Sequence, residues 1–136
     1  MSFAHRLLFM LTAVAVALCV ASVLYPVDWS QPIWQIFGVL VFALALMVPF
    51  IIIFALKRFI KTTEMVYGLC ALNVVLMLAW LYFFSRTFIW GGIRDSHANI
   101  VFAVAPIYGI VLAVGVGGLI FMADIALRGL REKDEK

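Results

Sequence analysis

Four long apolar runs constrain this sequence more than any other feature. They cover residues 7–25, 33–56, 64–84 and 99–126. Each reaches or exceeds the roughly 18–20 residues that a helix needs to cross a hydrocarbon core about 30 Å thick. The alternation typical of membrane barrel strands is missing, and backbone groups in lipid must be hydrogen-bonded internally. The pattern therefore predicts four transmembrane helices.

Composition agrees with a membrane environment. Of the 136 residues, 67% are hydrophobic and 12% are charged, whereas soluble domains are nearer half apolar and a quarter charged. A water-soluble fold of this length cannot bury so much apolar surface. The first run also resembles a secretory signal, but Leu18 stands before Cys19 where a lipoprotein signal needs a small residue. We therefore expect an all-α integral membrane protein, with residues 1–136 forming one four-transmembrane-helix bundle.

The positive charges predict an orientation. Arg86 and Arg94 lie in the connector between the third and fourth runs. The other positive residues fall at the opposite ends of the runs, as Arg6, Lys57, Arg58, Lys61, Arg128, Arg131, Lys133 and Lys136. Because cytoplasmic loops are enriched in Lys and Arg, both termini are expected in the cytoplasm (N-in/C-in) and residues 128–136 form a cytoplasmic tail. The expected location is the cytoplasmic (inner or plasma) membrane.

A basic cluster formed by Lys57, Arg58 and Lys61 lies in the cytoplasmic connector. Long basic side chains at a membrane interface usually reach toward anionic headgroups. A docking patch for a cytosolic partner is the alternative.

Small residues recur at helical spacing in two runs. In the fourth run they are Ala105, Gly109, Ala113 and Gly117. In the first run, one row consists of Thr12, Ala15, Cys19 and Ser22, and a neighbouring row of Ala13, Ala17 and Ala21. Such rows let two helix backbones approach closely in lipid. They predict either a seam for an oligomer or partner, or packing within the chain's own bundle.

Two polar residues and two prolines interrupt the apolar runs. Asn73 lies deep in the third run and predicts an interhelical hydrogen bond, with a ligand contact as the alternative. Asp124 lies near the end of the fourth run, where an ion pair with Arg128 one turn later explains it. An acid on a proton or ion path is the other interpretation. Pro49 and Pro106 each free a backbone carbonyl and predict kinks.

The longest polar interruption before the tail is the connector at residues 85–99. It holds the candidates for recognition outside the membrane, which are Arg86, Trp90, Arg94, Asp95 and His97. Loops carry function more often than their share of residues. A connector without function already explains the segment, because Gly91 and Gly92 permit a turn and Ser96 or Asp95 can cap the fourth helix.

Catalytic chemistry finds little support in the residues. His5 and His97 are expected on opposite sides of the membrane, so they cannot share a metal or haem. Phosphate-binding loops and thiolate pairs at metal spacing are missing from the sequence. A basic cluster interleaved with stacking aromatics, typical of nucleic-acid binding, is also missing. We therefore expect a non-enzymatic protein without cofactor, metal or nucleic-acid partner.

Three function classes remain as hypotheses. The favoured one is an accessory or interaction subunit that binds another membrane protein or an external partner, for example as an immunity-type protein. The alternative is a homo-oligomeric channel or small-solute transporter with a path between protomers. A membrane-embedded enzyme or lipid-handling protein is the third. The expected partners are the lipid bilayer and either another membrane protein or further copies of this chain.

Overall fold

The computed structural model describes residues 2–25, 29–85 and 96–136, with the side chains of 96–103 left out. Helices account for almost all of these residues, and the described part of the chain contains no strand. The helices are α1 (Phe3–Leu24), α2 (Ile33–Leu56), α3 (Thr63–Ser85) and α4 (Ser96–Asp134). All four are long and apolar enough to cross a membrane. The predicted all-α fold with four such helices is therefore confirmed.

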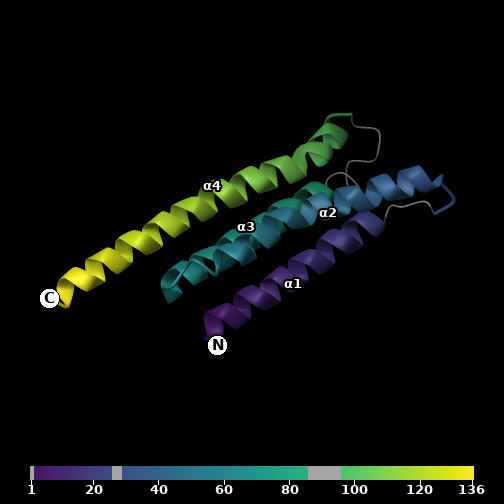
Figure 1. The fold of residues 1–136 in the computed structure, drawn as a ribbon. Coiled ribbons are helices and arrows are strands. Elements are labelled where there is room, and N and C mark those ends of the chain that lie inside the picture. Colours follow the sequence, from purple (N-terminus) through teal and green to yellow (C-terminus); the bar gives the residue numbers. More distant parts are fainter. Residues whose placement is uncertain (1, 26–28, 86–95) are drawn as a thin grey trace.

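The helices follow the apolar runs, with differences at their ends. Pro32 precedes α2 directly, and its carbonyl accepts hydrogen bonds from the amides of Gln35 and Ile36. Proline suits this position because its fixed φ and missing amide hydrogen cost nothing there. At 39 residues α4 is much longer than a membrane core requires. Its last turns extend beyond the other helices, so most of the expected tail is helical (Figure 1).

Helices α1 and α4 occupy opposite corners of the bundle. Helix α1 packs against α2 and α3, and α4 packs against the same two helices. Within the described residues α1 and α4 make no contact, while α2 and α3 meet across the centre. Both chain termini lie at one end of the bundle, together with the connector at residues 57–62 (Figure 1). We call this end the terminal end.

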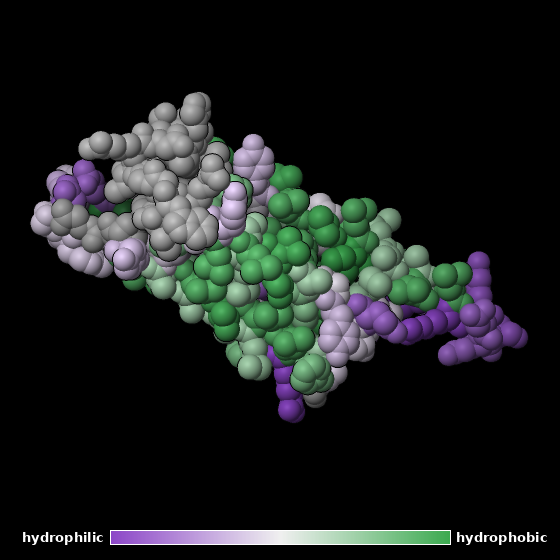
Figure 2. Space-filling view, turned by 180° about the vertical axis from the view of Figure 1, so that it is seen from behind, coloured by the Kyte–Doolittle hydropathy of each residue, from purple (hydrophilic) through white to green (hydrophobic). Residues whose placement is uncertain are grey.

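Apolar side chains cover the outside of the bundle as well as its interior. Trp34 and Leu119 are more than two-thirds exposed, whereas Leu8, Ile53 and Leu69 are fully buried. On the face in Figure 2, hydrophobic residues form the middle of the molecule, and hydrophilic ones lie toward its two ends. Helices that are apolar on the outside as well as the inside need a hydrocarbon surrounding.

Candidate functional site

The small-residue row of α4 packs against α2. A Cβ atom on Gly109 would lie 2.8 Å from Cγ of Pro49, and one on Gly117 would lie 2.5 Å from Cδ1 of Leu56. Ala113, between the two glycines, is fully buried. Glycine at these positions therefore brings the backbone of α4 close to α2. A partner seam at this row would require α2 to move away.

The first small-residue row of α1 also faces the inside of the bundle. Ala15, Cys19 and Ser22 are buried. The Cys19 thiol donates to the carbonyl of Leu46 on α2, with a sulfur–oxygen distance of 3.8 Å. The Ser22 hydroxyl accepts a hydrogen bond from Nε1 of Trp80 on α3 at 2.9 Å and donates to the Cys19 carbonyl at 3.0 Å. This row therefore joins α1 to two helices at once.

Asn73 makes the predicted interhelical hydrogen bond, but with only half of its amide. Its Nδ2 donates to Oγ1 of Thr12 on α1 at 3.2 Å, and that hydroxyl donates to the Leu8 carbonyl at 2.8 Å. The side chain of Asn73 is fully buried, and its Oδ1 has no hydrogen-bond partner among the described residues. The amide thus links α1 to α3 while one polar atom stays unsatisfied.

The neighbouring alanine row of α1 lies on the outside. Ala13, Ala17 and Ala21 are all exposed. Next to Ala13, a shallow groove of about 320 Å³ runs between α1 and α2. The rings of Phe9 and Phe54, with centroids 6.1 Å apart, border it. The rows beginning at Thr12 and Ala13 differ by one position in the sequence, yet they face opposite surroundings.

Asp124 fastens α4 to the start of α3 at the terminal end. Its Oδ1 accepts hydrogen bonds from the Thr62 amide at 2.9 Å and the Thr62 hydroxyl at 2.6 Å. The Lys61 amide lies 3.3 Å from both carboxylate oxygens, and Nη2 of Arg128 lies 2.9 Å from Oδ2. The predicted pair with Arg128 is therefore present, together with three donors from the connector. These donors come from residues some 62 positions earlier, so sequence spacing gave no sign of them.

The basic cluster of Lys57, Arg58 and Lys61 lies at the same end of the bundle. Nζ of Lys57 lies 4.9 Å from the centre of the Phe54 ring, while Arg58 and Lys61 are exposed. Beyond Asp124, the last turns of α4 are tied to α3 by an ion pair between Arg131 and Glu64 at 2.8 Å. Both partners of this pair are more than half exposed, so it contributes little to stability.

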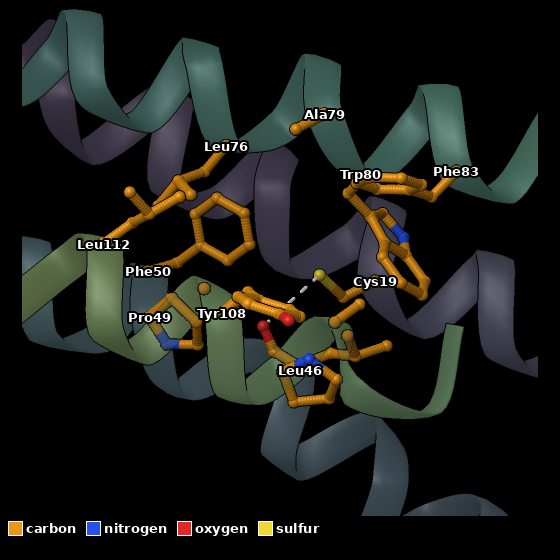
Figure 3. A pocket seen from close by; sticks show the side chains of 13 residues that line it. Cys19, Leu46, Pro49, Phe50, Leu76, Ala79, Trp80, Phe83, Tyr108 and Leu112 are labelled. Carbon is orange, nitrogen blue, oxygen red and sulfur yellow. Dashed lines mark hydrogen bonds between the residues drawn. The ribbon is translucent and has the colours of Figure 1, made fainter. Parts of the chain in front are cut away.

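A deep apolar pocket lies between α2, α3 and α4 in the half of the bundle away from the terminal end. Its volume is about 350 Å³. Figure 3 shows the rings of Phe50, Tyr108 and Trp80 around it, with the sulfur of Cys19 from α1 at its floor. The lining residues are Cys19, Leu46, Pro49, Phe50, Leu76, Ala79, Trp80, Phe83, Ala105, Pro106, Tyr108, Gly109 and Leu112.

No family model, curated protein or solved structure matches the chain. Its function is therefore inferred from its own residues and geometry. The described residues contain no group of three or more His, Cys, Asp or Glu side chains placed to hold a metal ion.

The structure does not describe the side chains that are candidates for recognition outside the membrane. Arg86, Trp90, Arg94 and Asp95 lie outside the described residues, as does the side chain of His97. Their role stays a prediction.

Proposed function

We propose that this chain is a small non-enzymatic membrane protein that acts as an accessory subunit and docks laterally to another membrane protein through α1. The observation that carries the proposal is the exposed row of Ala13, Ala17 and Ala21. A partner helix lying along this row approaches the backbone of α1 closely, which favours association in lipid through van der Waals contact.

Comparison of the three small-residue rows supports this choice. The rows that begin at Thr12 and at Ala105 pack against other helices of the same chain. The row that begins at Ala13 is exposed at all three alanines, and the adjoining groove offers a place for a partner's apolar side chain. Because α1 occupies a corner of the bundle, a helix can reach this face without displacing another one.

The distribution of charge supports an orientation with both termini in the cytoplasm. The segments at the terminal end contain eight basic residues, which are Arg6, Lys57, Arg58, Lys61, Arg128, Arg131, Lys133 and Lys136. Loops rich in Lys and Arg remain on the cytoplasmic side. We place the protein in the cytoplasmic membrane on this basis.

The character of the pocket favours an accessory subunit over a solute carrier. A carrier for ions or polar solutes needs polar groups along its path. Among the described residues the pocket is lined by apolar side chains, and Asn73 is not one of them. The amide of Asn73 is instead fully buried against α1.

Native mass spectrometry after gentle extraction from the membrane tests the proposal. We expect the wild-type chain to appear with one partner of fixed mass, and the double variant Ala13→Leu/Ala17→Leu to appear alone. The added branches hold a partner helix away from the α1 backbone. Val14→Leu is the matched control, since it enlarges an exposed residue of the same helix outside the row.

Two other outcomes have clear meanings. A complex that survives the double variant would rule out docking through the alanine row. A complex built only of copies of this chain would replace the accessory subunit by the homo-oligomeric channel or transporter, and flux through reconstituted liposomes would then be measured.

A further inference from the structure

The pocket between α2, α3 and α4 has the chemistry of a site for a linear hydrocarbon. Its floor contains two groups with polar hydrogens, and both are already engaged. The Cys19 thiol donates to the Leu46 carbonyl, and Nε1 of Trp80 donates to the Ser22 hydroxyl. Apart from the hydroxyl of Tyr108, an occupant therefore meets carbon on these walls, and a polar ligand would find few partners to replace its hydrogen bonds to water.

The pocket is also too deep for the flat face of another helix. Its rim includes Tyr108, which is 65% exposed on α4. Its floor reaches Cys19, which is 1% exposed and belongs to α1 at the opposite corner of the bundle. A thin, flexible chain can extend from rim to floor, whereas a partner helix would touch only the rim.

The walls explain why the protein does not fill this space itself. Ala79 and Ala105 contribute small side chains on facing helices, and Pro49 and Pro106 contribute compact rings. Gly109 cannot become larger, because any Cβ there would collide with the Pro49 ring. The volume of about 350 Å³ exceeds the roughly 150 Å³ in which a dry apolar cavity already binds benzene.

We propose that this pocket holds one acyl chain of a phospholipid from the surrounding bilayer, inserted between α3 and α4 with its methyl end toward Cys19. The occupant follows from the surroundings, because acyl chains are the abundant apolar molecules around helices of this composition. Burial of the chain replaces a void by close contacts and holds α2, α3 and α4 at their observed spacing.

Trp80 supplies a reporter inside the site. The purified chain, with Trp29, Trp34 and Trp90 replaced by Phe, is reconstituted into phosphatidylcholine vesicles. In one set of vesicles the lipid is brominated midway along one acyl chain. Bromine quenches indole fluorescence only at short range, and Trp80 is 6% exposed. We expect strong quenching in the brominated vesicles relative to the unbrominated ones.

Filling the pocket should remove this quenching. Ala79→Phe fills it from α3, and Ala105→Leu fills it from α4, so the test survives if one variant fails to fold. Ala71→Phe is the matched control, because Ala71 is an exposed residue of α3 that does not line the pocket. Quenching should persist in this control, and circular dichroism verifies that each variant is helical.

The outcomes separate the proposal from its competitors. Absent quenching in the otherwise unaltered pocket, or quenching that persists in both filled variants, would overturn it. Quenching by aqueous iodide instead of brominated lipid would mean that water occupies the space. The vesicles contain only this chain, so the result does not depend on partner docking at α1.

Discussion

The carboxylate of Asp124 joins two segments that are distant in the sequence. It is fully buried and accepts hydrogen bonds from the amides of Lys61 and Thr62, from the Thr62 hydroxyl and from Arg128. The sequence predicts only the pairing with Arg128, because a spacing of four residues on a helix is visible and a contact between loop and helix is not. The amide donors give Asp124 its structural role.

Two substitutions should distinguish these contributions. We expect Asp124→Ala to lower the free energy of unfolding by about 3 kcal/mol, because it leaves buried amide hydrogens without an acceptor. Arg128→Ala should cost about 1 kcal/mol or less, because its side chain is 31% exposed and the carboxylate keeps its other donors. Denaturation in detergent micelles, followed by circular dichroism, measures both. Equal losses would mean that the ion pair, and not the connector, dominates.

At Asn73, too, the sequence predicts only part of the hydrogen bonding. An amide in an apolar run predicts a hydrogen bond to a neighbouring helix, and the bond to Thr12 is present. The sequence does not say which of the two amide atoms is satisfied. Only the packed structure leaves Oδ1 without a partner among the described residues. Interhelical hydrogen bonds in membranes average roughly 0.6 kcal/mol, so this one contributes little.

Among the helices, α4 uses glycine in two different ways. Gly109 and Gly117 face α2, where a Cβ atom would collide with Pro49 or Leu56. Gly115 and Gly118 have nothing within 4 Å of the position of a Cβ atom. The sequence identifies the row at four-residue spacing but not the helix that covers it.

A series of alanine substitutions tests this distinction. We expect Gly109→Ala to destabilise the bundle by about 1–3 kcal/mol, because the Pro49 ring cannot move aside. Gly117→Ala should cost less, because its contact is the end of the flexible Leu56 side chain. Gly115→Ala should be neutral or stabilising by up to about 1 kcal/mol, since alanine favours helix. Thermal unfolding in micelles gives the order, and a most damaging change at Gly115 would contradict it.

For the whole molecule, the hydropathy of the sequence predicts the four helices but not which helices are neighbours. Four helices follow from the apolar runs, because length and composition alone decide whether a segment can cross a membrane. The arrangement, with α1 and α4 at opposite corners, does not follow from them. The rows that begin at Thr12 and Ala13 both consist of small residues, and only the packing of the helices shows which row faces the inside of the bundle. The pocket depends on residues of all four helices and leaves no local pattern.

The proposed orientation can be measured by cysteine labelling. Lys136→Cys lies at the terminal end, whereas Trp29→Cys, at a residue 63% exposed, lies at the other. In intact cells a membrane-impermeant maleimide should label only the Trp29→Cys variant, and in inverted vesicles only the Lys136→Cys variant. The unsubstituted chain is the control, because Cys19 and Cys70 are both buried. The reverse labelling would show that both termini face outward.

The bond between Asp124 and the connector also sets an order of events during synthesis. Residues 61 and 62 leave the ribosome long before Asp124, and domains generally form from the N-terminus as the chain grows. Until α4 is inserted, the amides of Lys61 and Thr62 lack the acceptor that finally holds them. Helix α4 thus fixes a connector that was made about sixty residues earlier, and a translation product interrupted before Asp124 lacks this bond.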